Sequence, residues 1–387
     1  MKNLSKLSRS GRRQVLAGAA ALLAAPALAQ TAAAAAKVER LNALGVRAGG
    51  QPLTAETLSQ QTLITISGPQ AAMMTDADMA LLAELPRLTG LTLSGLTQVT
   101  PAGYVHLVRL PVLATLALGN SQIDAARMAA LAGAPALANL YLLGNPTLND
   151  AAMPAIAAHQ RLVNLTIGST AVTDAGLAAL AGHPALSMLT LSGLRGVTDA
   201  GMAALARLSR LRSLSLNNTA VAGPGLAELA AIPGLRLLGL SQTNVDDGAM
   251  AHVAKLTALN TLYLAGARAV TDAGIGALAP LVELTGLDLN STRVSDVALA
   301  TVERMTKMQT LFLNMTGVTD AGMVSLAGLP LTLLTIAQTA VGDAGLLALA
   351  RIGTLFSIVA ARSRATAAGV SAALEVPGRN PQLRITI

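Results

Sequence analysis

The sequence predicts an α/β solenoid, in which short repeats stack in one row with parallel strands on one face and short helices on the other. The segment at residues 162–184 returns with variations along most of the chain, and its next copy begins 24 residues later at Leu186. Each copy opens with the spacing Leu-x-x-Leu-x-Leu, as at Leu162, Leu165 and Ile167. Apolar residues make up 52% of the 387 residues but aromatic residues only 1%, which favours aliphatic layers stacked along an axis.

The repeats begin at regularly spaced positions, most of them leucines. These are Gln61, Leu88, Leu113, Leu137, Leu162, Leu186, Leu211, Leu235, Leu259, Leu284, Met308, Leu331 and Leu355. After the longer first unit the spacing is 23 to 25 residues, which leaves no room for an inserted catalytic domain. We therefore expect about 13 repeats over 61–376, a linker and N-terminal cap over 30–60, and a C-terminal capping strand within 377–387.

Each repeat combines a strand with a helix start. The fourth and sixth positions of Leu-x-x-Leu-x-Leu face the core and the fifth faces outward, because successive strand residues alternate between faces. A Thr or Ser then stands where a helix N-cap is expected, at Thr173, Thr198, Thr271, Ser295 and Thr319. The next position carries Asp in most repeats and Pro at Pro101, two residues that favour the first helical turn.

These units resemble the bacterial leucine-rich repeats of the TxVTDAGLxxL type, which are similar to the cysteine-containing class, over about 61–376. The resemblance implies a right-handed horseshoe with a concave strand face and a convex helix face, and protein binding as the usual role. The cysteine-containing class is known from F-box proteins. No F-box segment is evident upstream of these repeats, so the ubiquitin-ligase function of that class is not implied. Threonines replace the asparagine that ties adjacent turns in many such families, and we expect them to bond the backbone similarly: Thr170, Thr219, Thr243, Thr292, Thr316 and Thr339.

The first 29 residues have the pattern of an export signal. A basic start precedes a short apolar run over 15–25 and the small-x-small site at residues 27–29. Residues 11–16 resemble the twin-arginine signal through Arg12 and Arg13, although Gly11, Val15 and Ala17 depart from its usual residues. We expect a cleaved signal and a periplasmic or secreted bacterial protein. The general secretory route and an uncleaved anchor are the alternatives.

Export changes how the charge is interpreted. The full chain has 27 basic and 20 acidic residues, a net charge of +7, but five of the basic residues lie in the signal. The remaining net charge is +2, which does not favour a nucleic-acid partner. No cysteine is present, so disulfides and thiolate metal sites are excluded.

Two sets of residues could in principle bind metal ions: the aspartates that share one position of the repeat, here called the aspartate column, and the histidines. The column consists of Asp76, Asp150, Asp174, Asp199, Asp247, Asp272, Asp296, Asp320 and Asp343. We expect each carboxylate to be neutralised by the start of its own helix rather than by calcium. His159 and His183 occupy the same slot of successive repeats, but no third ligand accompanies them, so we expect exposed loop histidines. No metal and no cofactor is predicted.

The fifth strand position is the candidate binding surface. It holds three of the five aromatic residues, Tyr141, Tyr263 and Phe312, together with Asp288. Asn217, Asn290 and Asn314 lie two positions further on and keep the surface polar. Exposed rings of this kind are enriched at interfaces, although strands favour aromatic residues in any case.

The sequence thus predicts an exported, non-enzymatic protein-binding or scaffold module that is a monomer. No histidine or glutamate lies in the fifth position to activate a hydroxyl nucleophile, and no catalytic motif is present. Glycan or cell-wall binding through the three rings is one alternative, and a secreted effector acting on a host protein is another. No nucleic-acid partner and no membrane span after the signal are expected.

Overall fold

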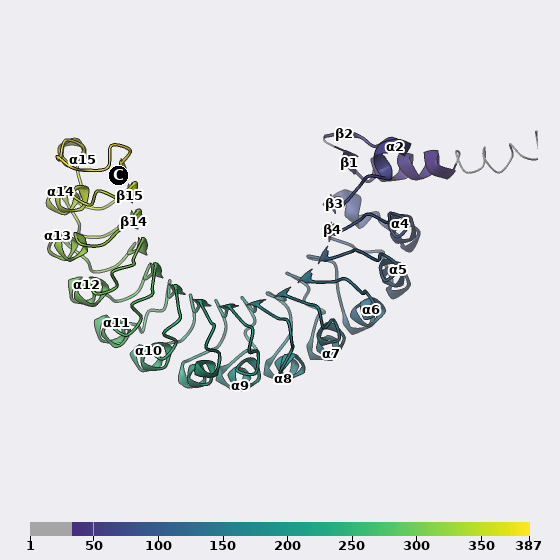
Figure 1. Ribbon diagram of the computed structural model, residues 1–387, viewed down its shortest axis with the longest axis horizontal. Helices are drawn as coiled ribbons and strands as arrows, with labels where there is room; N and C mark the ends of the chain where they lie inside the picture. The colour runs from purple at the N-terminus through teal and green to yellow at the C-terminus, as the bar shows by residue number, and fades with distance from the viewer. Residues whose placement is uncertain (1–32, 49) are drawn as a thin grey trace, which may run out of the picture.

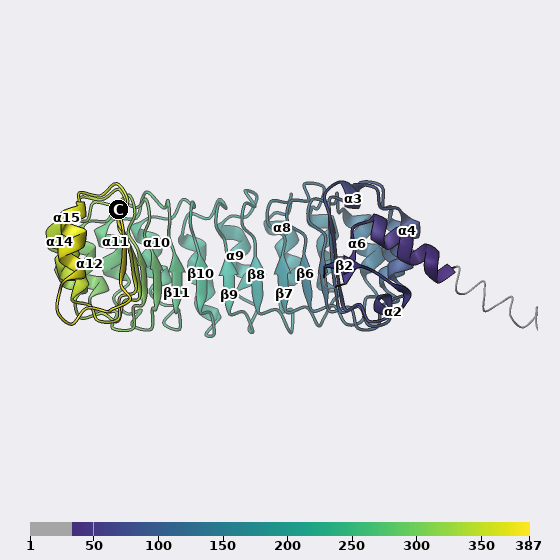
Figure 2. The ribbon, with the colours of Figure 1, turned by 90° about the horizontal axis from the view of Figure 1, so that it is seen from above.

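The computed structural model describes residues 33–48 and 50–387, so the predicted signal at 1–29 lies outside the described residues. The described chain forms an arc with the strands on its inner side and the helices on its outer side (Figure 1). Seen from above, the strands lie side by side along the arc (Figure 2). The predicted α/β leucine-rich-repeat horseshoe is therefore confirmed as the fold class.

One sheet of fourteen strands lines the inner face, in strict chain order and with every neighbouring pair parallel. Its strands are β3 (Leu63–Ser67), β4 (Gly90–Ser94), β5 (Thr115–Ala117), β6 (Asn139–Tyr141), β7 (Asn164–Thr166), β8 (Met188–Thr190), β9 (Ser213–Ser215), β10 (Leu237–Gly239), β11 (Thr261–Tyr263), β12 (Gly286–Asp288), β13 (Thr310–Phe312), β14 (Leu333–Thr335), β15 (Ser357–Val359) and β16 (Arg384–Thr386). The middle residue of each short strand from β5 to β15 is a buried apolar residue, while its neighbours mostly face the inner surface, as the alternation predicted.

Short helices cover the outer face. They are α3 (Pro69–Ala72), α4 (Asp76–Leu82), α5 (Pro101–Leu107), α6 (Ala125–Leu131), α7 (Met153–Ala157), α8 (Asp174–Leu177), α9 (Met202–Leu205), α10 (Asp247–Val253), α11 (Asp272–Ala277), α12 (Asp296–Val302), α13 (Asp320–Met323), α14 (Asp343–Ala350) and α15 (Ala367–Leu374). Several repeats use 3₁₀ turns: η2 (Asp150–Ala152), η3 (Ala178–Leu180), η4 (Asp199–Gly201), η5 (Pro224–Ala231) and η6 (Val324–Leu326). The helix starts were predicted at the Asp or Pro slot, and most helices begin there.

The aspartates at the helix starts join neighbouring repeats. Asp150 accepts hydrogen bonds from the backbone amide of Thr173, at 2.7 Å, and from its hydroxyl, at 2.6 Å. Asp174 holds Thr198 in the same way, and Asp247 holds Thr271. We had expected each carboxylate to act on its own helix start alone. Because these hydrogen bonds reach the N-cap of the next repeat, the column also fixes the spacing between repeats.

These aspartate hydrogen bonds between repeats explain the glycine of the Thr-Asp-Ala-Gly motif. A Cβ added at Gly176 would lie 2.3 Å from Oδ1 of Asp150, and one at Gly274 would lie 2.3 Å from Oδ1 of Asp247. The carboxylate of one repeat thus occupies the space where the next repeat would place a side chain. Where the preceding slot lacks a carboxylate, as at Pro101, the glycine is replaced, in that case by Arg127.

The threonine column bonds the backbone, but within its own turn. The Thr170 hydroxyl donates to the carbonyl of Ile167 at 2.8 Å, and Thr243 and Thr292 bond their own turns at 2.6 Å. These threonines therefore bond the backbone as expected, but they do not tie adjacent turns, because at this position the hydroxyl points to the carbonyl three residues back in its own turn. Asn145 does bridge them: its Nδ2 donates to two carbonyls and its Oδ1 accepts the amides of the preceding repeat.

The N-terminal end of the core is covered by non-repeat structure. A helix at residues 33–43 is followed by the antiparallel pair β1 (Arg47–Ala48) and β2 (Gln51–Pro52) and by α2 (Ala55–Leu58). Leu41, Leu44 and Val46 are buried there against the first layer. Arg40 and Asp78 form an ion pair beneath this cap, with nitrogen–oxygen distances of 2.7 and 2.8 Å.

Candidate binding face

The inner surface is almost uncharged along its length. From β3 to β15 the strands contain a single charged residue, Asp288 on β12. The first and third residues of each short strand face this surface, as does the residue two positions after the strand. The sequence-predicted site residues all lie in the latter two of these columns.

The structure brings three of the predicted residues together on consecutive strands. Tyr263 on β11 is in register with Asp288 on β12, and Asp288 is in register with Phe312 on β13. Neighbouring strands lie about 5 Å apart, so the two rings flank the carboxylate from both sides. All three side chains are half-buried. We call Tyr263, Asp288 and Phe312 the aromatic–acidic cluster.

A hollow of about 220 Å³ opens beside this cluster, and it is lined by Tyr263 and Phe312 but not by Asp288, which lies two residues beyond Gly286 on the same strand. Gly286, the first residue of β12, contributes no side chain between Thr261 and Thr310 on the neighbouring strands. The remaining lining residues are Tyr263, Thr285, Leu287, Gln309 and Phe312. Sequence reasoning missed Gly286, Thr261 and Thr310 because it followed the fifth position of the repeat and the position two residues later, but not the first residue of each strand. Strand alternation, which also turns the first strand residue outward, was the signal that could have found them.

Asp288 has few partners for a half-buried carboxylate. Its Oδ1 accepts the backbone amide of Asn290 at 3.0 Å. None of the salt bridges in the described residues involves it. Burial raises the pKa of Asp288, and the bond from Asn290 offsets only part of that effect. The carboxylate therefore has hydrogen-bonding capacity left for a ligand.

The three predicted asparagines have a structural task. The Oδ1 atoms of Asn290 and Asn314 accept the backbone amides of Asn314 and Ala337, each at 2.7 Å, and Oδ1 of Asn217 accepts that of Ser241 at 2.8 Å. These bonds link successive repeats just beyond the strands. In Asn290 and Asn314 the Nδ2 group takes part in no hydrogen bond within the described residues, so its two hydrogens remain free to donate.

Tyr141 and Asn217 lie apart from the cluster. Tyr141 is on β6 between Ala117 and Thr166, five strands before Tyr263. At about 5 Å per strand that separation is roughly 25 Å. Asn217 follows β9, two strands before β11. The predicted site thus divides into a compact group near β11–β13 and two outlying positions.

The histidine pair is buried, which corrects the expectation of exposed loop residues. His159 is 4% exposed and His183 5%. Nε2 of His183 lies 3.1 Å from the carbonyl oxygen of His159, and its Nδ1 accepts the amide of Ala185 at 3.4 Å. Burial lowers the pKa of both imidazoles. His183 therefore acts as a neutral link between repeats, with Nε2 as its donor.

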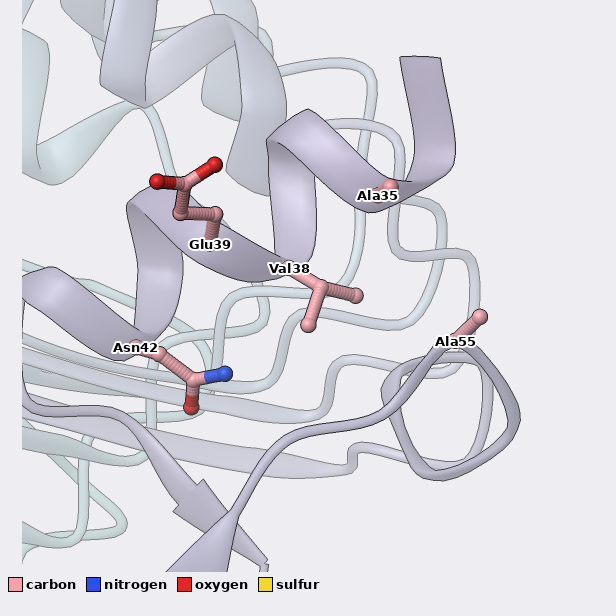
Figure 3. A pocket seen from close by; sticks show the side chains of 5 residues that line it. All are labelled: Ala35, Val38, Glu39, Asn42 and Ala55. Atoms are coloured by element: carbon pink, nitrogen blue, oxygen red, sulfur yellow. The ribbon is translucent and has the colours of Figure 1, made fainter. Parts of the chain in front are cut away.

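A second hollow, which no sequence motif indicated, lies at the N-terminal cap. It measures about 500 Å³ and is lined by Ala35, Val38, Glu39, Asn42 and Ala55. Figure 3 shows Ala55 on a separate segment across from the helix that carries the other four. The carboxamide of Asn42 already bonds both backbone groups of Leu53, at 2.7 and 3.0 Å. Glu39 is the other polar side chain of this lining, beside Ala35, Val38 and Ala55.

Metal centres and membrane spans are two further kinds of site that concern the described residues, 33–48 and 50–387. Within these residues no group of three or more acidic or histidine side chains lies close enough to hold a metal ion. No helix in the described part of the chain is long and apolar enough to cross a membrane.

The arc is similar to several solved structures. An internalin (inlF) of Listeria monocytogenes matches with a TM-score of 0.59 and 21% identity, over 92% of this chain and 94% of that one. A chain of the Rad7 and Elc1 complex of yeast matches with a TM-score of 0.56 and 18% identity, over 98% of each chain. A leucine-rich-repeat protein of Leptospira interrogans gives 0.47 and 14% identity, over 79% and 92%. No protein-family model and no curated protein matches the sequence. At these identities the likeness shows the fold, and by its fold the chain is a leucine-rich-repeat solenoid.

Proposed function

We propose that the chain is an exported, non-enzymatic binding protein that holds a protein partner on its concave face. The observation that carries this proposal is the aromatic–acidic cluster, in which two half-buried rings flank a carboxylate on a rigid parallel sheet. Half-exposed rings on a fixed scaffold offer contact area at a low cost in side-chain entropy. One of the similar chains comes from a two-protein complex, that of Rad7 and Elc1, so the fold is compatible with such a role.

The test uses the full chain as bait in an envelope extract of its own source organism. We expect a protein to be retained by the wild type and lost when Tyr263→Ala and Phe312→Ala are combined. Val297→Ala is the matched control, because Val297 is 70% exposed on α12 at the outer face. Retention that survives the double substitution, or that Val297→Ala removes equally, would reject the concave face as the binding surface.

Glycan binding is a second candidate, because Tyr263 and Phe312 lie only two strands apart and the hollow between them is lined by hydroxyl groups. Rings at such spacing can stack on sugar rings. Soluble peptidoglycan fragments and neutral oligosaccharides should then bind the wild type directly, as measured by calorimetry. Binding of these sugars without any retained protein would favour this candidate over the first.

Export is part of the proposal and rests on residues 1–29. If the twin-arginine route is used, replacing Arg12 and Arg13 by Lys together should keep the chain in the cytoplasm, because that route reads the arginine pair. Cell fractionation with immunoblotting measures the outcome. Normal periplasmic accumulation of the double variant would reject the twin-arginine route and leave the general secretory route.

A further inference from the structure

We infer that the hollow at the aromatic–acidic cluster binds a basic side chain, a lysine or an arginine, of the protein partner. This inference rests on the proposed protein-binding function and specifies the chemistry of the contact. It follows from the charge pattern of the face, from the unfilled bonding capacity of Asp288, and from the position of the two rings.

The charge pattern selects a cation. Asp288 is the single charged residue on the strands from β3 to β15, so the strand face carries one negative charge, and that charge lies at this point. A single negative charge on a neutral surface attracts one positive group to a defined place. A neutral sugar could donate hydroxyl hydrogen bonds to Asp288, but only a basic side chain would also compensate its charge.

The carboxylate lacks a strong partner. Its one hydrogen bond in the described residues comes from a backbone amide, that of Asn290, and no cation lies within salt-bridge distance. A half-buried carboxylate without a counter-charge is costly, and a ligand cation that pairs with it removes part of that cost. Burial raises the pKa of Asp288, which is consistent with a carboxylate that lacks a counter-charge.

The rings stand where they can contact the same cation. Tyr263 and Phe312 are each one strand away from Asp288, on opposite sides, and a cation within about 6 Å of a ring centre is attracted to the ring face. The hollow over Gly286 accepts the aliphatic part of the side chain. The hydroxyls of Thr261 and Thr310 and the amide of Gln309 border it and can bond the partner's main chain.

Gly286 provides a substitution that fills the hollow without straining the fold. A Cβ there would meet only the side chain of Thr261, at 3.5 Å, an ordinary contact distance. Gly286→Leu therefore blocks the space that the basic side chain needs. Ser213→Leu is the matched control, since Ser213 is the first residue of β9 and faces the same surface three strands away.

The probe is the end-blocked peptide Gly-Gly-Lys-Gly-Gly, compared with the same peptide carrying norleucine in place of lysine. Binding to the full chain is followed by NMR titration, with the ring signals of tyrosine and phenylalanine labelled. We expect the lysine peptide to bind about tenfold more tightly than the norleucine peptide at low salt, and the preference to shrink as salt is added. Asp288→Asn should abolish the preference, and Gly286→Leu should abolish binding of both peptides.

Glu228→Gln removes a charge from an exposed position on η5 at the outer face and should leave the preference unchanged. Equal affinity of the wild type for the two peptides, or a lysine preference that survives Asp288→Asn, would overturn the inference. The same holds if a neutral oligosaccharide binds the hollow while the lysine peptide does not.

The partner assay separates this inference from the proposed function. If Tyr263→Ala with Phe312→Ala abolishes retention of the protein partner but Asp288→Asn does not, the concave face binds protein without using a cation. If neither change affects retention, the proposed function itself fails. Loss in both cases, together with the peptide preference, supports both conclusions.

Discussion

At the scale of single residues, burial alternates within a strand so sharply that neighbouring positions have opposite roles. Leu189, the middle residue of β8, is fully buried, whereas Thr190 beside it faces the inner surface. The same alternation places Leu262 in the core and Tyr263 on the candidate binding face. Substitutions one residue apart should therefore differ greatly in their effect on stability.

We expect Leu189→Asp to destabilise the central repeats by several kcal/mol, because it places an unpaired carboxylate in an apolar layer. Thr190→Asp should cost far less, since its side chain reaches water. Thermal unfolding followed by circular dichroism measures the difference. Similar melting temperatures for the two variants would mean that the strand faces are assigned the wrong way round.

At the scale of the element, each helix start depends on its neighbour. The aspartate at the start of one helix accepts bonds from the N-cap of the next, and the glycine two residues after the next aspartate makes room for that carboxylate. Ala298 is the exception. It stands at the glycine position although Asp272 of the preceding repeat is bonded to Ser295 in the same way. The motif is therefore best understood as one interaction between two repeats.

Helix α11 contains a matched pair of glycines that tests this account. Gly274→Ala should cost about 2 kcal/mol, because its Cβ would lie 2.3 Å from Oδ1 of Asp247. Gly276→Ala, with nothing within 4 Å of its Cβ, should be neutral or stabilise by up to about 1 kcal/mol. Combining Gly274→Ala with Asp247→Ala should cost less than the sum of the single changes in a denaturant titration. Additive costs would show that the carboxylate is not the obstacle.

The N-terminal cap should be sensitive to acid through Asp78, which is 3% exposed. Burial alone would raise the pKa of Asp78, but hydrogen bonds from Arg40 and Thr75 and the charge of Arg40 lower it overall. A lowered folded-state pKa means that the carboxylate stabilises the cap above the ordinary pKa of 3.8, and that this contribution is lost as the pH falls through the folded value.

We expect Arg40→Met to destabilise the cap by about 2 kcal/mol at neutral pH and to weaken this acid dependence, because the carboxylate loses its counter-charge. Hydrogen exchange of α4, measured by mass spectrometry across pH, follows both effects. Replacing the exposed Glu39 by Gln on the same N-terminal helix is the control and should change neither. An acid dependence that is unaltered in Arg40→Met would exclude the ion pair as its source.

At the scale of the whole molecule, the arc follows from the different widths of its two faces. Neighbouring strands lie about 4.8 Å apart, whereas a helix with its side chains is about 10 Å wide, so stacked repeats must bend toward the strands. Several repeats use 3₁₀ turns on the outer face, which are wound more tightly than an α-helix. In this stacking each repeat contacts mainly its two neighbours. The first and last repeats each lack one neighbour, so their exposed sides must be capped.

We expect the full chain to be a monomer, because the outer edge of β16 is poorly suited to pairing. Arg384 holds its guanidinium 5.7 Å from the centre of the Phe356 ring, which keeps a charge at the last described strand. Arg379 bonds the carbonyls of Leu374 and Asn380 and so caps α15. Light scattering after size-exclusion chromatography gives the mass. A dimer that becomes a folded monomer when residues 383–387 are deleted would contradict the expectation.

The period of the repeats, the faces of the strands and the starts of the helices could all be predicted from the amino-acid sequence. These features depend on residues only a few positions apart, such as Leu165 and Ile167 in a strand or Thr173 and Asp174 at a helix start, and they recur often enough to be read without a structure. The sequence also indicated that Tyr263, Asp288 and Phe312 fall in equivalent positions of successive repeats.

The contacts between repeats could not be predicted in this way and became visible in the folded chain. That Asp150 bonds Thr173, that His183 is buried against the backbone of His159, and that Gly286 leaves a hollow between two rings all depend on residues more than twenty positions apart. Such residues meet only when the layers stack, and their contacts depend on side-chain length and on the side chains around them. For that physical reason the periodic pattern predicted the scaffold, while the shape and the unmet charge of the candidate site came from the packed molecule.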